Sequence, residues 1–171
     1  LVEHYHTFPL IQKGFEDVEE FIQLANSISN RRKSRSGKSL ELHLENIFKE
    51  EGLEQFGVQC TTEGRKKPDF LFPDCQSYHD AVFPKEKLRM LAVKTTVKDR
   101  WRQILNEADH IDAPHLFTLQ RGVSENQFKE MQEANVKLVV PKPIHNSFPK
   151  PVRGALISLS GFIEETKLLY K

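Results

Sequence analysis

The sequence predicts an α/β domain in which a mixed central sheet is flanked by helices. Short apolar runs typical of strands alternate with segments whose apolar residues recur at helical spacing, in the order α-α-β-β-β-α-β-α-β-α. The chain has 171 residues and shows neither repeats nor low-complexity tracts nor an internal boundary. This length fits one domain, residues 1–171, with a full hydrophobic core.

Two helices joined by a basic connector are expected in the N-terminal part. Apolar residues at helical spacing predict a first helix over about 15–29 and a second from Leu40 to the stop signal Gly52. Residues 30–38 are rich in serine and basic residues, and they are predicted to form a connector outside both helices.

The strands of the sheet are predicted from short apolar runs. These runs lie at residues 57–62, 69–72, 88–97, 114–120 and 136–140. The order of strands and intervening helices indicates a sheet with both parallel and antiparallel pairs.

Three further helices are expected after the strand at 88–97. The first, over 99–110, has an apolar stripe at i, i+3, i+4 and i+7 that consists of Trp101, Ile104, Leu105 and Ala108. Ser124 and Gln127 form a capping box that begins a helix to about residue 134. Prolines punctuate an irregular stretch at 141–151, and apolar residues at 162–169 predict a closing helix.

A Pro-Asp motif followed by a lysine points to a metal-dependent phosphodiesterase site. Asp69 precedes the apolar run Phe70–Phe72, and Lys94 lies 25 residues after Asp69, within the strand predicted at 88–97. A carboxylate at a strand edge can anchor Mg²⁺, which prefers oxygen ligands and shares its coordination sphere with substrate phosphate. The lysine can orient or activate the attacking water and offset charge on the phosphate.

The second carboxylate of the usual motif is missing. It normally lies two residues before the lysine, and that position is Ala92 here. Glu107 is the candidate replacement, because it lies next to Ile104 on the border of the apolar stripe. A helix that crosses back over its strand would aim Glu107 at the strand end that carries Lys94.

These residues belong to longer segments that resemble the EcoRII-like restriction endonucleases. The resemblance covers about residues 30 to 128 and includes Glu107. Its segments are Asn30–Glu41, Lys66–Pro73, Lys94–Gln103 and Gly122–Phe128. It implies the restriction-endonuclease-like PD-(D/E)xK fold, a homodimer, and Mg²⁺-dependent cleavage of double-stranded DNA at CC(A/T)GG-like sites that leaves 5′-phosphates.

The resemblance also implies roles for single residues. Asp69, Lys94 and Glu107 are the implied catalytic set with Glu41 nearby, and Asp69 and Glu107 are the implied metal ligands. Enzymes of this family can extrude the central A·T bases of their site. Some carry an additional N-terminal DNA-binding regulatory domain, and a start at Leu1 fits a piece excised from such a longer chain.

Glu41 and Lys98 each allow two interpretations. Glu41 opens the second predicted helix, where its charge either complements the helix dipole or supports the metal site. The resemblance favours the metal site. Lys98 lies four residues beyond Lys94 and either contacts a DNA phosphate or is solvated.

The basic connector is the candidate DNA-binding segment, since five of its eight residues from 31 to 38 are basic. The arginine fork matches the O6/N7 edge of guanine, so at least one of Arg31, Arg32 and Arg35 is expected to read a base. A point charge suffices for a phosphate, which is the role assigned to Lys33 and Lys38. The alternative is a solvated charge run.

Residues 36–39 resemble the end of a phosphate-binding P-loop. However, Arg32 occupies the position of the first glycine of that motif, and no strand precedes it, so no nucleotide cofactor is expected.

Composition and spacing exclude other classes of protein. The net charge of +1 and a pI near 8.0 indicate local basic patches rather than a global cationic field. No apolar run approaches the roughly 20 residues of a membrane span, and a cytoplasmic, prokaryotic protein without a membrane role is expected. The seven histidines show no zinc-enzyme spacing. Cys60 and Cys75 form no CxxC pair and are expected to be reduced thiols.

The function expected from all this is that of a type II restriction endonuclease. Two alternatives remain open: a non-catalytic DNA-binding domain of the same fold, and a structure-specific nuclease that acts on branches or ends. Tyr78 invites a third idea, covalent recombinase-type chemistry, but a loop tyrosine is far more often a packing or hydrogen-bonding residue.

Overall fold

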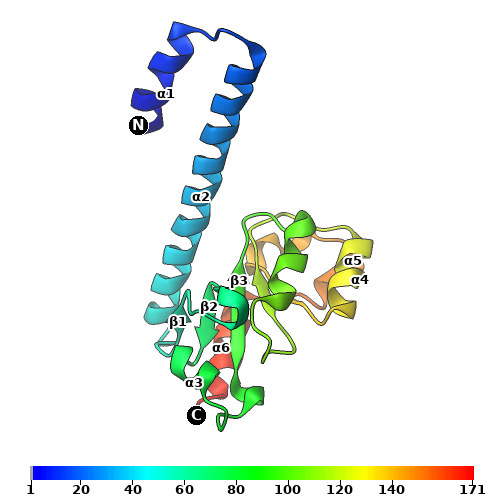
Figure 1. Cartoon of the computed structure of the whole chain (residues 1–171). Helices are drawn as coiled ribbons and strands as arrows, with labels where there is room; N and C mark the ends of the chain where they lie inside the picture. The colour runs from blue at the N-terminus through cyan, green and yellow to red at the C-terminus, as the bar shows by residue number, and fades with distance from the viewer. Residues whose placement is uncertain (1) are drawn as a thin grey trace. The chain divides into compact units, whose positions relative to one another are not determined.

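The computed structural model describes residues 2–171, except for the side chains of residues 2–4 and of Asp99. The chain divides into two compact units, one ending at Ser39 and the other spanning Leu40–Lys171. The division falls within helix α2 (Val18–Glu50), which follows α1 (Val2–Lys13) in the first unit (Figure 1). None of the helices in residues 2–171 combines the length and apolar character that crossing a membrane requires.

Residues 30–38 are part of helix α2, so the prediction that they form a connector between two helices is wrong. Arginine and lysine are good helix formers, and a serine or a glycine such as Gly37 costs at most about 1 kcal/mol relative to alanine. Buried Leu44 and Phe48 anchor the C-terminal part of the helix in the second unit. Glu41 therefore lies inside the helix and not at its start.

The second unit contains a five-stranded sheet in the order β1-β2-β3-β4-β5, and Figure 1 labels its first three strands. The sheet is mixed, as the sequence predicts. The first three strands pair antiparallel and the last three pair parallel. Their bounds are β1 Gly57–Val58, β2 Phe70–Phe72, β3 Arg89–Val93, β4 His115–Phe117 and β5 Lys137–Val139. Each strand lies within its predicted run but is shorter, because pairing with a neighbour, and not apolarity, ends a strand.

Successive residues of each strand face two separate cores. On one face, Met90 of β3 packs in a cluster with Trp101. On the other face, Leu91 shares a cluster with Phe48 of α2 and Phe162 of α6 (Leu159–Leu168). Because both faces are covered, β3 reads in the sequence as a continuous apolar run without alternation.

The remaining helices are α3 Cys75–His79, α4 Glu125–Glu133 and α5 Lys150–Arg153. Short 3₁₀ helices lie at η1 Glu63–Arg65, η2 Lys85–Lys87, η3 Lys98–Asn106 and η4 Lys142–Ser147. Helix α4 begins as predicted, because the Ser124 hydroxyl accepts a hydrogen bond from the Gln127 N–H at 3.2 Å.

The segment after β3 is the 3₁₀ helix η3, whereas the sequence predicts an α-helix over 99–110. Side chains at i and i+3 align in a 3₁₀ helix. Trp101 and Ile104 are therefore in line with Glu107, and both are buried. Leu105, which the α-helical stripe would have buried, is 38% exposed. The three-residue period thus brings Glu107 onto the inner face.

Cys60 and Cys75 form a disulfide, so the expectation of two reduced thiols is wrong. Cys60 follows β1, and Cys75 begins α3 just after β2. The antiparallel pairing of β1 with β2 brings their Cα atoms to 5.5 Å, within the range that a disulfide spans. The separation of 15 residues along the chain carries no sign of this proximity.

Candidate active site

Asp69 immediately precedes β2 and is held at both carboxylate oxygens. It is only 7% exposed. Its Oδ2 accepts hydrogen bonds from the Val93 N–H at 2.6 Å and from Lys94 Nζ at 3.3 Å, and its Oδ1 accepts one from Gln59 Nε2 at 3.0 Å. The antiparallel pairing of β2 with β3 places the residue before β2 beside the residues that end β3, and so aims this carboxylate at Lys94.

Lys94 directly follows β3 instead of lying inside a strand as predicted. Its N–H still donates to the Phe117 carbonyl of β4 at 3.0 Å, which holds its backbone at the sheet edge. The ammonium lies 3.3 Å from Oδ2 of Asp69 and 3.8 Å from Oε1 of Glu107. One half-buried cation therefore contacts two carboxylates that come from other parts of the chain.

Glu107 lies at the C-terminal end of η3 and is mostly buried, with 17% of its side chain exposed. Burial raises the pKa of Glu107 above its ordinary value; Lys94 opposes this shift, Asp69 adds to it, and Lys66 opposes it. Its Oε2 is buried and accepts no hydrogen bond from any residue that the structure describes. Burial thus outweighs the two nearby lysines and disfavours the charged form of Glu107.

The carboxylates of Asp69 and Glu107 fit a hard divalent cation. Mg²⁺ is usually bound by one or two carboxylates together with water and substrate phosphate. The unpartnered, buried Oε2 of Glu107 is an acceptor that such an ion would satisfy. Residues 2–171, as far as their side chains are described, contain no group of three or more His, Cys, Asp or Glu able to hold a metal. An ion here would therefore depend on water and substrate for its other ligands.

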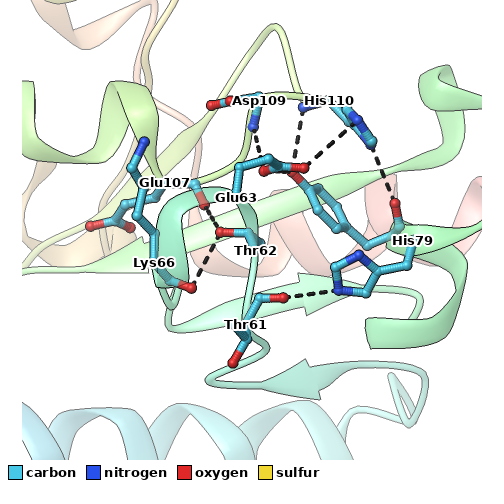
Figure 2. A network of polar contacts seen from close by, with 9 residues as sticks. Thr61, Thr62, Glu63, Lys66, His79, Glu107, Asp109 and His110 are labelled. Atoms are coloured by element: carbon cyan, nitrogen blue, oxygen red, sulfur yellow. Dashed lines mark hydrogen bonds and ion pairs between the residues drawn. The ribbon is translucent and has the colours of Figure 1, made fainter.

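The main chain around Glu107 is held by a polar network (Figure 2). The Thr62 hydroxyl donates to the Glu107 carbonyl at 2.5 Å. The next residue, Glu63, accepts from the Tyr78 hydroxyl at 2.6 Å and from the Asp109 N–H at 3.4 Å. His110 stacks on the Tyr78 ring with a centroid distance of 5.0 Å. This network joins the segment before β2 to the residues that follow η3.

Tyr78 is a hydrogen-bond donor inside this network. It is 1% exposed, and burial and the Glu63 carboxylate raise the pKa of its hydroxyl. A protonated, buried phenol is a poor nucleophile. The packing therefore fits the structural interpretation of Tyr78, and not the covalent one.

Gln59 and Thr62 are the residues of this site that sequence reasoning missed. Neither belongs to the Pro-Asp…Lys motif, and both lie in the segment between β1 and β2. Their only signal in the sequence is that two polar residues follow a short apolar run. Their contacts arise because the pairing of β1 with β2 places the segment between these strands next to Asp69 and η3.

Comparison with known proteins places this geometry in a family. A family model described as EcoRII C terminal matches residues 1–163. The chain belongs to this EcoRII C-terminal family. The type II restriction enzyme EcoRII of Escherichia coli is 62% identical over 170 residues, which are 99% of this chain and 42% of that enzyme. The chain thus spans less than half the length of this relative.

Solved structures agree on the fold of this EcoRII C-terminal domain. Metal-depleted Ecl18kI in complex with uncleaved, modified DNA matches with a TM-score of 0.74 and 23% identity, over 95% of this chain and 55% of that one. The PspGI–substrate DNA complex matches with a TM-score of 0.70 and 16% identity, over 94% of this chain and 70% of that one. The fold is that of restriction endonucleases, as predicted.

The other predicted residues of this EcoRII-type domain lie on helices. Glu41 is half-buried within α2. Lys98 is exposed and begins η3 with a φ of 27°, so it does not share a strand face with Lys94. The five basic residues at positions 31–38 of α2 are all exposed, and they are Arg31, Arg32, Lys33, Arg35 and Lys38. The supporting role of Glu41 in the metal site stays a prediction.

Proposed function

We propose that this chain is the catalytic domain of a type II restriction endonuclease that hydrolyses phosphodiester bonds of duplex DNA. The observation that carries the proposal is a lysine that contacts the buried carboxylate of Asp69 and the mostly buried carboxylate of Glu107. One oxygen of Glu107 has no hydrogen-bond partner among the described residues. Membership of the EcoRII C-terminal family supports the same activity, and CC(A/T)GG-like sites are the proposed substrate.

The proposed chemistry uses each of the three residues differently. Asp69 and Glu107 hold Mg²⁺ through their carboxylate oxygens. Mg²⁺, when bound, supplies Lewis-acid stabilisation of the phosphate and of the leaving 3′-oxygen. Lys94 holds the attacking water in line with the scissile bond and offsets charge on the phosphate. Cleavage then leaves a 5′-phosphate.

DNA recognition is assigned to the basic residues of α2. Because the helix is continuous, Arg31, Arg35 and Lys38 recur at i, i+4 and i+7 and share one face. Exposed side chains that project from a continuous helix are spaced regularly along it, which suits contacts in a DNA groove. Arg31, Arg32 and Arg35 are proposed to read bases, while Lys33, Lys38 and Lys98 contact phosphates.

The symmetry of the proposed site calls for a homodimer. A two-fold DNA sequence matches a two-fold protein, with one active centre for each strand. The central A·T pair breaks that symmetry, and extrusion of its bases is proposed to resolve the mismatch. Extrusion costs a few kcal/mol and is easiest for a weak pair.

Digestion of a plasmid of known sequence tests the proposed function. The chain with Mg²⁺ should produce discrete fragments whose mapped ends fall at CC(A/T)GG-like sequences. A shift of DNA on a gel without cleavage would indicate a binding domain that has lost its chemistry. Cleavage confined to branches or ends would indicate a structure-specific nuclease instead.

Arg32→Ala should weaken binding to DNA that contains the site much more than binding to random DNA. The expected loss on site-containing DNA is about 1–3 kcal/mol, because a bidentate arginine–guanine pair is worth that much. Equilibrium titration of both DNAs in Ca²⁺ measures it. Lys38→Ala is the matched control, since loss of a phosphate contact should weaken both DNAs equally and lower the salt dependence. An equal loss for Arg32→Ala would reassign Arg32 to a phosphate.

A further inference from the structure

Both acidic residues of the candidate site are contacted by one segment between β1 and β2, Gln59–Lys66, which we call the clamp segment. At its start, the Gln59 N–H donates to the Asp69 carbonyl at 3.2 Å, and the Gln59 side-chain amide donates to Asp69 Oδ1 at 3.0 Å. The donor must be the NH₂ group, because an ionised carboxylate only accepts. With Val93 and Lys94 on Oδ2, the two oxygens of Asp69 receive donors from opposite sides.

The backbone of Gln59 adopts a conformation that favours glycine. Its φ is +52°, in the left-handed region that residues with a side chain rarely occupy. Strained residues of this kind cluster at functional sites, where surrounding contacts hold them in place. A glycine would adopt this backbone readily but would lack the amide that reaches Asp69. The strain and the amide contact thus occur in the same residue.

Further along the clamp segment, Thr62 holds Glu107 by its main chain. Thr62 is 6% exposed, and its N–H donates to the Lys66 carbonyl at 2.8 Å. Its hydroxyl lies 2.5 Å from the Glu107 carbonyl and 3.3 Å from the Lys66 carbonyl (Figure 2). Carbonyls at a helix end lack partners within the helix. Thr62 provides a partner for the carbonyl of Glu107, which caps the C-terminal end of η3.

The clamp segment is itself anchored to the rest of the domain. Cys60 is bonded to Cys75 at the start of α3. Glu63 accepts hydrogen bonds from the Tyr78 hydroxyl and from the Asp109 N–H. Both anchors lie next to the residues that contact the site, Cys60 beside Gln59 and Glu63 beside Thr62. The clamp segment therefore has a fixed position from which it can orient Asp69 and Glu107.

We propose that the clamp segment positions both metal-binding carboxylates, with Gln59 orienting Asp69 through its side chain and Thr62 orienting Glu107 through its main chain. This inference rests on the proposed function. Both are positioning residues, because they act through the metal ligands and do not themselves touch the reacting atoms. Hydrogen-bond partners of metal ligands typically contribute about 10- to 100-fold to metal affinity or activity.

The experiment measures Mn²⁺ affinity without cleavage, from the relaxation of water protons in the protein bound to an uncleavable CC(A/T)GG duplex. Gln59→Ala and Thr62→Val should each weaken Mn²⁺ binding by about 10- to 100-fold. The same variants should need correspondingly more Mg²⁺ for half-maximal cleavage of a cleavable duplex. Circular dichroism checks that each variant is folded.

Conservative variants separate the side-chain contacts from the backbone. Thr62→Ser keeps the hydroxyl and should bind Mn²⁺ like the wild type. Gln59→Gly relieves the left-handed backbone but lacks the amide, so it should be as defective as Gln59→Ala even if it is more stable. Gln55→Ala and Thr61→Val are matched controls at exposed positions, and they should leave Mn²⁺ affinity unchanged.

The outcomes distinguish the clamp from the proposed function. If the wild type cleaves DNA and binds Mn²⁺, but Gln59→Ala and Thr62→Val match its affinity, the clamp is wrong and the nuclease assignment stands. If Gln59→Gly binds Mn²⁺ normally, the amide has no role and the clamp is likewise overturned. If the wild type neither binds Mn²⁺ nor cuts DNA, the proposed function fails and the clamp fails with it.

Discussion

Asp69→Asn should abolish DNA cleavage while leaving DNA binding intact. The substitution keeps the size of the side chain but replaces a carboxylate that receives the Val93 N–H, the Lys94 ammonium and the Gln59 amide. A neutral amide cannot anchor a hard cation with comparable strength, so the cleavage rate in Mg²⁺ should fall at least about 1000-fold. Single-turnover cleavage of a short duplex measures the rate, and titration in Ca²⁺ measures binding.

The control for Asp69→Asn is Asp109→Asn, which removes an exposed carboxylate close to the site in the chain. It should cleave at the wild-type rate. An Asp69→Asn protein that cuts normally would remove Asp69 from the metal site. An equal loss of binding and cleavage would instead show that the substitution damages the fold.

Lys94→Met should reduce both cleavage and stability, and Mg²⁺ should restore only the stability. The rate should fall about 100- to 1000-fold, because the cation that orients water and offsets phosphate charge is gone. Without metal, Asp69 and Glu107 lose the ammonium that both contact. The free energy of unfolding should fall by about 1–3 kcal/mol, and not by more, because the three side chains stay 10–18% exposed to water.

Chemical denaturation with and without Mg²⁺ measures this effect of Lys94→Met. A bound cation replaces the missing ammonium between the carboxylates and binds only the folded state, so it should recover most of the lost stability. Lys129→Met is the control, since Lys129 lies on an exposed face of α4 and pairs only loosely with Glu133 at 3.9 Å. Stability that falls without responding to Mg²⁺ would mean that no ion binds between Asp69 and Glu107.

Ala92 occupies the position of the missing second carboxylate, and the choice of its replacement shows what residue spacing can and cannot predict. Residue pattern and resemblance both select Glu107 as the replacement acid, and the structure places its Oε1 3.8 Å from Lys94 Nζ. The reason given from the sequence was an α-helical border position, whereas the observed helix has a three-residue period. Period-three and period-four patterns overlap at Trp101 and Ile104, so the sequence could not distinguish them.

The errors at α2 and at the cysteines have the same cause, which is that contacts between distant residues decide both features. Serine, glycine and a run of like charges weaken a helix only slightly, and Leu44 and Phe48 anchor its C-terminal part through contacts that local composition does not report. Cys60 and Cys75 meet because two strands pair, which no spacing rule encodes.

The sequence by itself determined the mixed α/β architecture, the apolar strands, and the choice of Asp69, Lys94 and Glu107 as the residues to examine. Those follow from residue type and period, which are local properties. Only the tertiary structure decided that Gln59 and Thr62 contact these residues, and that one oxygen of Glu107 has no hydrogen-bond partner among the described residues. Both depend on contacts between distant parts of the chain, whose free energy no single segment determines. The structure also decided that the five basic residues lie within one continuous helix, which is anchored through Leu44 and Phe48.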